Sequence, residues 1–572
     1  MVKQFIIFGV LCLIGFTGFG QNTLAIPPTL SGENISLSLQ EGTTSFYPGV
    51  ITNTMGANGA LLGPTLILQK DSFVSITVSN QLTDTTTIHW HGMHVAAKND
   101  GGPHTVILPG SSWNPQFTVL DKAGINWYHP HLHMQTDKHV SKGIAGLIIV
   151  KDAEEEALNL PRTYGVDDFP IVMQTKGFDA GGQIEVHTEM DTSVMVNGTV
   201  NALVDFPAQV VRLRVLNGAS QRTFELGFSN NQTFSLIGTD GGLLTAPVNL
   251  TRYRMVPGQR ADILIDLSAS MGANFQLMSF ASELPRAIYG AAQPGMGPGA
   301  TIPGYSGNPL NGTDFQLLDI NVVTQTATPV LSIPSALAVY STLPEASANI
   351  TRDLTFTSTG TMGNIVGPFL INGTGFDMDV INYDVPLNHV EIWSLTNQTP
   401  IGHPFHIHDV QFFILDINGI PPAPALQGLN DVVFVPAGNG NVRFIAQFND
   451  FADDSIPYMY HCHMLTHEDA GMMGQFLVTD STSTIKEADN LFNDILIYPS
   501  PSVNGNFTVD FSAISEQAVA YKIISIQGKQ VESNAISHYT KQLELSINTP
   551  PGVYLFVLYT SEGLIIKKFL IN

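Results

Sequence analysis

The sequence predicts an all-β protein of several domains, and three observations lead to this fold class. Charged residues make up only 13% of the 572 residues and hydrophobic residues 44%, which disfavours disorder, coiled coils and salt-bridged helical surfaces. The chain has 52 Gly and 34 Pro, which is typical of many turns. Runs such as VSITV and VRLRVL alternate as half-buried strands do. The length suits roughly three to five domains, so we expect sandwiches or barrels.

The charge balance excludes one class of partner. Lys and Arg total 24 against 48 Asp and Glu, which gives a formal net charge of −24. Such a field repels phosphate backbones and anionic lipid surfaces. We therefore expect no nucleic-acid partner.

The N-terminus reads as an export signal. Residues 1–20 combine Lys3, a short apolar run and the small residues Gly18 and Gly20, as a cleaved secretory signal peptide does. The run is too short to span a membrane comfortably, and we expect no integral membrane segment in the mature chain. We therefore expect the protein to be exported from the cytoplasm and to pass through the periplasm.

The cysteine count then becomes informative. Cys12 leaves with the signal peptide, so the mature chain keeps Cys462 alone and has no internal disulfide. A lone thiol in an exported protein is open to oxidation. By composition alone, Cys462 is equally a small buried hydrophobe or a metal ligand.

Strand-like runs with intervening turns divide the chain into blocks. We expect domains over residues 21–152, 153–325 and 345–480, with linkers at 326–344 and 481–490 and a distinct C-terminal domain at 491–572. The 326–344 stretch is rich in Thr, Pro and Ser and poor in charge, as linkers are.

Histidines are spaced for metal binding. Among 17 histidines, His-x-His pairs occur at 89/91, 129/131, 131/133, 406/408 and 461/463. Residues i and i+2 of a strand point to the same face, so each pair offers two imidazoles on one side. Imidazole clusters suit copper, zinc or iron.

The segment HCHMLTHEDAGMM narrows the choice of metal. If it is extended, Cys462 points away from His461 and His463, so one tripeptide serves two sites back to back. His467 and His403 complete a Cys/His/His set for Cys462, with Met472 nearby. That is the ligand set of a blue-copper centre, whereas zinc more often has a closed tetrahedral site or an open His/carboxylate site.

Four motifs together resemble those of the multicopper oxidases, in the order of that family. They are HWHG at 89–92, WYHPHLH at 127–133, HPFHIH at 403–408 and HCHMLTHEDAGM at 461–472. The resemblance covers about residues 30–480 and implies three cupredoxin-like Greek-key β-sandwich domains. The third and fourth motifs are most similar to bacterial laccase-like, copper-efflux and bilirubin oxidases.

Carried over position by position, the resemblance implies four copper ions. Type 1 copper would have the ligands His403, Cys462, His467 and Met472. Type 2 copper would have His89 and His406. One ion of the type 3 pair would have His91, His129 and His463, and the other His131, His408 and His461.

The C-terminal residues 491–572 resemble a type IX secretion sorting domain. The order of YPSP, NGNFTV, PPGVYLFVL and KKFLIN carries this resemblance, which implies the secretion machinery as a partner and a secreted or cell-surface destination. An ordinary β-sandwich accessory domain is the alternative.

The family resemblance implies a laccase-like oxidase. It would couple four one-electron oxidations of phenols, aromatic amines or similar small donors to the reduction of O2 to two waters, with electrons entering near His403 or His467. A cuprous oxidase for copper tolerance is one alternative, but only Met362 and Met378 lie between residues 326 and 403, where the copper-efflux group has a Met-rich insertion. A non-catalytic copper-binding or scaffold protein is the other.

Two carboxylates are candidate proton donors for O2 reduction. Asp100 follows the first motif in KNDGGP, and Glu468 directly follows His467. The resemblance to the bacterial subgroup implies this role, because both residues match acidic positions that serve O2 reduction there. Carboxylates transfer protons readily once they are positioned. The competing interpretations are a turn residue for Asp100 and a solvated acid for Glu468.

Overall fold

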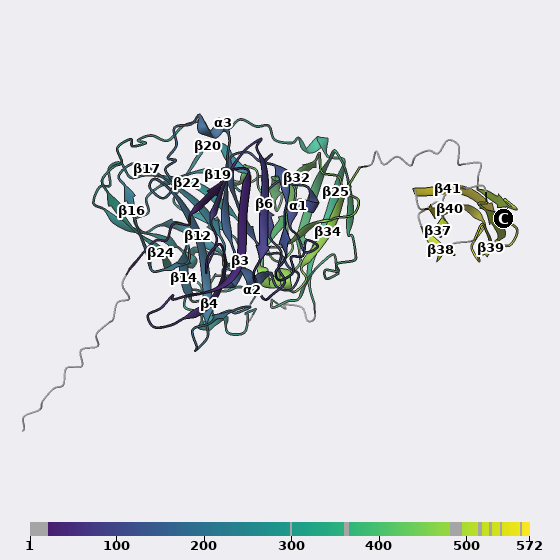
Figure 1. The fold of residues 1–572 in the computed structure, drawn as a ribbon, viewed down its shortest axis with the longest axis horizontal. Helices are drawn as coiled ribbons and strands as arrows, with labels where there is room; N and C mark the ends of the chain where they lie inside the picture. The colour runs from purple at the N-terminus through teal and green to yellow at the C-terminus, as the bar shows by residue number, and fades with distance from the viewer. Residues whose placement is uncertain are drawn as a thin grey trace, which may run out of the picture. The chain divides into compact units, whose positions relative to one another are not determined.

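The computed structural model describes residues 21–297, 300–359, 365–480, 495–512, 518–525, 529–537, 540–560 and 563–572. The predicted signal peptide (1–20) and the predicted linker at 481–490 lie outside these residues. The chain divides into two units, one ending at Thr479 and one beginning at Asp480 (Figure 1). The described residues are predominantly strands, as the sequence predicts.

The N-terminal part of the first unit contains two five-stranded sheets. The one that carries the first histidine motifs has the order β2(Thr29–Ser31), β5(Thr65–Gln69), β11(Gly146–Lys151), β10(Gly124–His129) and β7(His89–His91). The other contains β4(Thr52–Ala57), β3(Asn34–Thr44), β6(Phe73–Asn80), β8(Ser112–Trp113) and β9(Gln116–Thr118). Buried and less buried residues alternate along β6, as expected of a strand with one face on a core.

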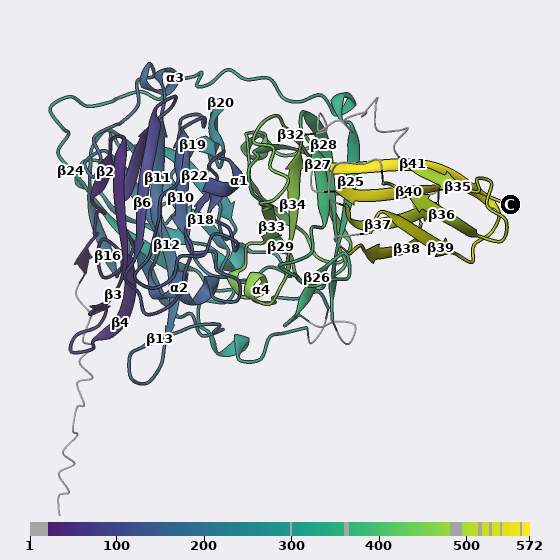
Figure 2. The same cartoon turned by 45° about the vertical axis from the view of Figure 1, so that its right-hand side comes forward.

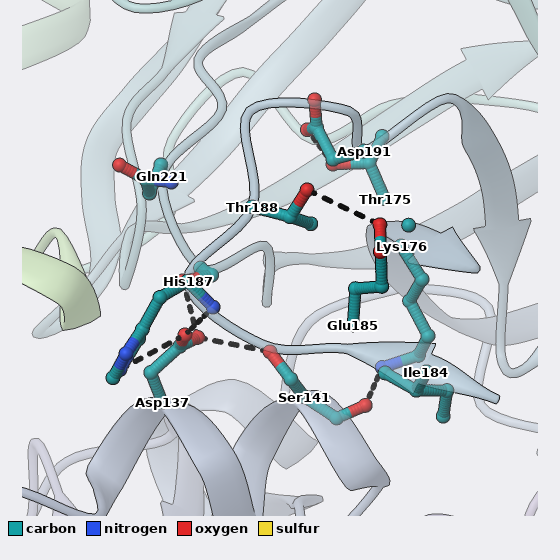
Figure 3. Close-up of a pocket in the computed structure, with 12 residues that line it drawn as sticks. Asp137, Ser141, Thr175, Lys176, Ile184, Glu185, His187, Thr188, Asp191 and Gln221 are labelled. Atoms are coloured by element: carbon teal, nitrogen blue, oxygen red, sulfur yellow. Dashed lines mark hydrogen bonds and ion pairs between the residues drawn. The ribbon is translucent and has the colours of Figure 1, made fainter. Parts of the chain in front are cut away.

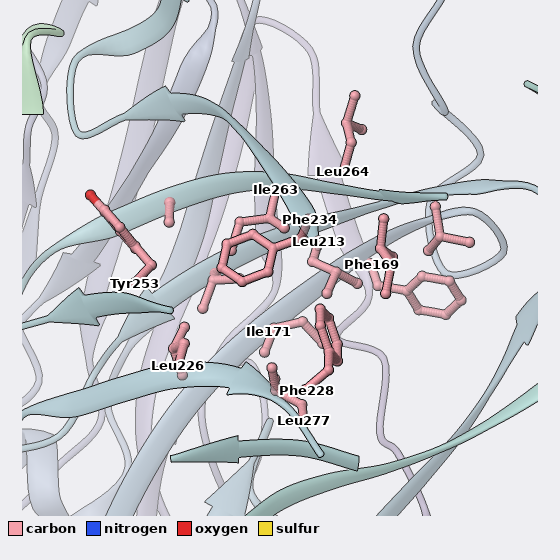
Figure 4. Packing of buried hydrophobic residues seen from close by; sticks show 14 of the residues in the cluster. Phe169, Ile171, Leu213, Leu226, Phe228, Phe234, Tyr253, Ile263, Leu264 and Leu277 are labelled. Atoms are coloured by element: carbon pink, nitrogen blue, oxygen red, sulfur yellow. The ribbon is translucent and has the colours of Figure 1, made fainter. Parts of the chain in front are cut away.

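The central part of the unit has the largest apolar core. Its six-stranded sheet contains β1(Asn22–Thr23), β16(Ala202–Pro207), β24(Phe315–Val323), β23(Asn274–Ser279), β18(Phe224–Phe228) and β21(Tyr253–Met255). Its eight-stranded sheet contains β15(Thr199–Val200), β14(Ser193–Val196), β12(Asp168–Phe178), β17(Val210–Asn217), β22(Arg260–Asp266), β19(Phe234–Thr239), β20(Gly242–Leu250) and β13(Ile184–Glu185). Figure 4 shows Phe169, Phe228 and Phe234 packed between these sheets.

The third part again pairs two five-stranded sheets. One has the order β26(Phe369–Ile371), β25(Ile350–Ser358), β28(His389–Asn397), β32(Gly440–Phe448) and β30(Phe412–Ile417). The other, which carries the last two motifs, has the order β27(Tyr383–Pro386), β34(Met473–Thr479), β33(Tyr458–Cys462), β29(His403–Ile407) and β31(Val432–Val435). Residues 326–344, before this part, contain neither helix nor strand.

The second unit has its own core. One sheet contains β35(Leu496–Tyr498), β36(Asn506–Asp510) and β39(Gln542–Ser546), and the other β38(Gln530–Ala535), β37(Ala518–Ser525), β40(Gly552–Thr560) and β41(Gly563–Ile571). Phe507, Tyr521, Phe556 and Phe569 pack together between the sheets. This separate core is what an independently folding domain requires.

The helices are short, and two of them meet beside the motifs. They are α1(Ala97–Asp100), α2(Thr136–Lys142), α3(Ala153–Glu156) and α4(Leu465–Asp469), with 3-10 turns at Ala281–Glu283, Tyr305–Gly307, Glu345–Ser347 and Pro424–Leu426. Helices α2 and α4 lie side by side (Figure 2). Asp469, at the end of α4, accepts hydrogen bonds from the first two backbone N–H groups of α2, at 2.9 and 3.0 Å. Within the described residues, no helix has the length and apolar character needed to cross a membrane.

Candidate metal centre

Two pairs of neighbouring strands carry the histidines. In the first part, β7 pairs with β10 in a register that sets His89 opposite His129. In the third part, β29 pairs with β33, with His406 opposite His461 and Phe405 opposite Cys462. Because alternate residues share a face, each His-x-His pair projects two rings in one direction.

Eight histidines from these strands and the loops after them converge in one buried cluster. The rings of His89 and His408 stack with centroids 3.8 Å apart, and those of His91 and His406 with centroids 3.7 Å apart. All eight are at most 1% exposed. Their donor nitrogens fall into three groups, each within 4.8 Å: His89 with His91 and His406; His91 with His129 and His463; His131 with His408 and His461.

In four of the eight rings, Nδ1 is anchored by a hydrogen bond and Nε2 lacks a hydrogen-bond partner. Among the described residues, the buried Nε2 atoms of His89, His129, His406 and His408 have none. The Nδ1 atoms of these rings bond, in the same order, to the Asp100 carbonyl, the Pro130 carbonyl, the Asp431 carbonyl and the Asp100 carboxylate, at 2.8–3.0 Å. Buried polar atoms without partners are costly, and metal-binding histidines are oriented in this way.

Burial also keeps the rings in the metal-binding form. Desolvation, and after it the neighbouring imidazoles, hold the pKa of His129 and of His406 well below 6.5. The same causes lower the pKa of His463 to about 3. Neutral imidazole has the lone pair that a metal needs, so the donor set fits copper.

A second group of possible metal donors consists of His403, Cys462 and His467. The Cys462 Sγ atom is 3.5 Å from His403 Nδ1 and 3.6 Å from His467 Nδ1, and the two nitrogens are 3.3 Å apart. Three donors around one ion at ordinary N and S bond lengths lie about 3.5 Å apart, so the triangle is of the right size. Met472, completely buried in the same apolar core, donates its N–H to the His467 carbonyl.

The back-to-back arrangement expected from the tripeptide is present. Cys462 belongs to the His403 and His467 group, whereas His461 and His463 belong to the eight-histidine cluster. One extended strand end therefore connects two sites through adjacent residues.

The group of His403, Cys462 and His467 is more enclosed than the sequence predicts, since we expected an exposed edge at His403 or His467. His403 is 0% exposed, and its Nε2 atom donates to the Thr399 hydroxyl at 2.8 Å. His467 is 6% exposed. Phe369 packs against both rings, with centroids 4.7 and 4.6 Å away.

Asp100 and Glu468 each contact two cluster histidines. The Asp100 carboxylate lies 2.8 Å from His408 Nδ1 and 3.3 Å from His89 Nδ1. The Glu468 carboxylate lies 3.3 Å from His131 Nδ1 and 3.2 Å from His461 Nδ1. Both side chains are buried, so Glu468 is not a solvated acid.

The turn interpretation of Asp100 also holds in part. Asp100 ends α1, and Gly101 follows with φ of 83°. A Cβ atom at position 101 would lie 1.7 Å from the Ile88 carbonyl oxygen, so glycine is required there. The turn thus brings the Asp100 carboxylate onto the histidines.

Sequence reasoning missed two residues of the cluster's surroundings. Asp431 Oδ1 lies 3.2 Å from His91 Nε2, and its backbone carbonyl accepts from His406. Arg260 donates to both Asp431 carboxylate oxygens. Arg260 begins β22 and Asp431 directly precedes β31, and no local sequence pattern distinguishes either residue.

A polar pocket lies near this centre between α2, β12 and the segment around His187. Asp137 accepts from the Ser141 hydroxyl at 2.9 Å and from the His187 N–H at 2.8 Å, while Lys176 Nζ donates to the Ser141 carbonyl at 2.5 Å (Figure 3). These hydrogen bonds join α2, β12 and the segment around His187 to one another.

Comparison with known proteins decides the family. Two sequence models described as multicopper oxidase match residues 38–155 and 345–482. The multicopper oxidase mco of Staphylococcus haemolyticus is 33% identical over 480 residues, which cover 81% of this chain and 93% of that protein. The chain belongs to the multicopper oxidase family.

Solved structures show the fold of this multicopper oxidase to be of the cupredoxin type, as expected. The laccase-like multi-copper oxidase CueO of Ochrobactrum sp. is 32% identical with a TM-score of 0.69, over 80% of this chain and 100% of that one. McoA of Aquifex aeolicus is 28% identical with a TM-score of 0.70, over 81% of this chain and 100% of that one.

The family is functionally mixed. The cell division protein FtsP of Photorhabdus laumondii is 30% identical to this chain over 470 residues, which cover 80% of this chain and 92% of FtsP. The C-terminal sorting domain of secretion systems matches residues 496–572, which confirms the resemblance of the tail.

Proposed function

We propose that this multicopper oxidase is laccase-like and couples four one-electron oxidations of phenols, aromatic amines or similar donors to the reduction of O2 to two waters. The observation that supports this most strongly is the pair of donor groups joined through Cys462. A site that only stores copper has no need for such a connection.

The proposed copper ligands are those expected from the sequence. His403, Cys462, His467 and Met472 would hold type 1 copper, and His89 and His406 type 2 copper. The type 3 pair would be held by His91, His129 and His463 and by His131, His408 and His461. Copper, when bound, supplies the one-electron chemistry and the site of O2 reduction.

The chain's own residues orient the ligands and connect the sites. Backbone carbonyls and the Asp100 carboxylate hold the Nδ1 atoms of His129, His406 and His408, so that their Nε2 atoms are left for a metal. The covalent path from Cys462 to His461 and to His463 crosses one peptide bond in each direction. Asp100 and Glu468 are proposed to hand protons to the O2 site, because both carboxylates lie against its histidines.

Family membership alone leaves a non-catalytic role open, since FtsP is a relative. The complete set of ten histidines and one cysteine, gathered into the groups described above, favours turnover. A cuprous substrate is the second candidate, because a Campylobacter jejuni relative, 26% identical, is described as a metallo-oxidase.

The sorting domain supports export to the cell surface or the medium, with the secretion machinery as a partner. We also propose that the three cupredoxin-like domains span residues 21–152, 153–325 and 345–480.

The experiment is steady-state O2 uptake by the copper-loaded protein with a phenol, with Cu(I) and with neither donor. Uptake with the phenol supports the laccase assignment, uptake with Cu(I) alone supports the cuprous oxidase, and none with either supports the scaffold. Cys462→Ser is the control, and it should abolish both the blue colour and the uptake because the chain then lacks the thiolate of type 1 copper. A blue Cys462→Ser protein would contradict the assignment.

A further inference from the structure

A large apolar hollow lies between the central and third parts of the oxidase. Its volume is about 530 Å³, within the range of small-molecule sites. The apolar lining includes Tyr253, Ile288, Ile414, Leu426 and Phe434. A hollow of this size and character suits an aromatic ring.

The hollow adjoins the strand that carries His403. Phe434 lies on β31, whose register with β29 sets Phe434 opposite Pro404 and Val435 opposite His403. The Ala287 carbonyl, from the other wall, accepts the Gly402 N–H at 2.8 Å. Neighbouring strands are about 4.8 Å apart, so a molecule in the hollow is separated from the His403 segment by little more than one strand.

Three arginines and no carboxylate contribute to the described lining of the hollow. Two of the arginines are already paired, Arg254 with Glu225 at 2.7 Å and Arg252 with Glu283 at 3.0 Å. Arg286 is exposed, and in the part of the chain that the structure describes no hydrogen bond or ion pair engages its guanidinium. In a chain of net charge −24, an exposed guanidinium that no acidic side chain engages is a group that attracts an anion.

We propose that this hollow binds aromatic carboxylates, with the ring on the apolar wall and the carboxylate on Arg286. The proposal rests on the proposed function, for which it names the donor class as phenols bearing a carboxylate. Guanidinium and carboxylate match in a two-bond geometry, which gives orientation as well as affinity.

The reaction balances with O2 as the oxidant. Each bound phenol loses one electron and its hydroxyl proton and becomes a phenoxyl radical. Four phenols supply the four electrons and four protons that convert one O2 into two waters. The carboxylate stays bound to Arg286 and takes no part in the electron transfer.

Binding is tested first with a pair of probes that have no phenolic hydroxyl. The copper-loaded protein is titrated calorimetrically with 4-methoxycinnamate and with its methyl ester. The acid should bind about tenfold more tightly than the ester, in line with the strength of a charged hydrogen-bonded pair. Arg286→Ala should remove this preference, and Arg286→Lys should retain part of it.

Lys142→Ala is the matched control. It removes one positive charge from α2, outside the lining of the hollow, and should leave the preference unchanged. Equal affinities of acid and ester for the wild-type protein, or an unchanged preference in Arg286→Ala, would overturn the inference.

Turnover separates this inference from the proposed function. With 4-hydroxy-3-methoxycinnamate, Arg286→Ala should raise KM about tenfold and leave kcat unchanged, whereas the kinetics of the methyl ester should not respond. If both phenols are oxidised with the same KM, the carboxylate site is wrong and the oxidase assignment stands. If the acid binds through Arg286 but neither phenol is oxidised, the site stands and the laccase assignment fails.

Discussion

The guanidinium of Arg260 holds the carboxylate of Asp431 through two hydrogen bonds, with Nη1 2.6 Å from Oδ1 and Nη2 bonded to Oδ2. Arg260 also donates from Nε to the Ile125 carbonyl of the N-terminal part. Asp431 in turn contacts His91 and His406. One completely buried arginine of the central part thus helps to position His91 of the N-terminal part and His406 of the third part.

Arg260→Lys should therefore weaken copper binding by the eight-histidine cluster and leave the group of His403, Cys462 and His467 undisturbed. One ammonium cannot hold both carboxylate oxygens in the fork geometry. We expect copper affinity of the cluster or turnover to fall about 10- to 100-fold, with the blue band retained. Copper content, visible absorption and kcat are the measurements.

The control for this substitution is Arg214→Lys. Arg214 makes a similar buried pair with Asp168, at 2.8 and 2.9 Å, but neither residue contacts a cluster histidine. If Arg214→Lys loses as much cluster copper as Arg260→Lys, general destabilisation explains the loss and the positioning role is wrong.

Asp100→Asn should slow the reoxidation of the reduced enzyme by O2 about tenfold or more, because a buried acid next to the histidines no longer supplies protons. Glu468→Gln should act in the same direction, since Glu468 is equally buried and also contacts two cluster histidines. Stopped-flow absorption of the type 1 band follows the reaction.

Copper content and the blue band should stay at wild-type values in both variants. Asp121→Asn removes another buried carboxylate of the N-terminal part, one that accepts from the His94 N–H, and should reoxidise normally. If Asp100→Asn with full copper content is reoxidised at the wild-type rate, Asp100 serves only the turn and does not supply protons.

His139 should make the fold sensitive to mild acid. Burial, and after it the charge of Lys138, lowers the pKa of His139 from 6.5 to about 4. Between these pH values the unfolded chain binds a proton that the folded chain does not, so stability is complete above about pH 6.5 and falls as the pH decreases to 4. The loss at pH 4 is up to about 3 kcal/mol.

His139→Gln has no proton to gain and should lose this part of the pH dependence. Unfolding free energies of both copper-loaded proteins between pH 7 and pH 4.5 provide the comparison. Parallel curves for the two proteins would show that His139 does not contribute.

Removal of residues 480–572 should leave oxidase activity and copper content intact, because this unit has its own core and contributes no residue to the eight-histidine cluster or to the group of His403, Cys462 and His467. Export should stop, since the sorting domain goes with it. The location and specific activity of the truncated protein are measured together. Normal secretion would contradict the sorting role.

The sequence was sufficient to predict the β class and the direction in which paired histidines point, because both depend on local features. Which donors share one ion is implied by the resemblance to the multicopper oxidases and stays a prediction. His-x-His spacing on a strand sets the direction of two rings, and the Cys462 tripeptide sets two sites back to back. Asp100 is likewise only 11 residues from His89 in the chain, and the turn at Gly101 brings its carboxylate to 3.3 Å from His89 Nδ1.

Long-range pairing was beyond sequence reasoning. Arg260 and Asp431 are 171 residues apart, and their ion pair depends on how three parts of the chain pack. The enclosure of His403 and the hollow lined by Arg286 have the same origin. The sequence around Arg260 and around Asp431 does not differ from that of a residue in an ordinary strand or loop.

The most direct test of the central claim is the stoichiometry of O2 uptake during oxidation of a phenol by the copper-loaded protein. An oxygen electrode, with the phenoxyl radical counted spectroscopically, gives the ratio of donor to O2. We expect four donors to be consumed for each O2 and no hydrogen peroxide to accumulate. A ratio of two with hydrogen peroxide as the product, or no uptake at four coppers per chain, would contradict it.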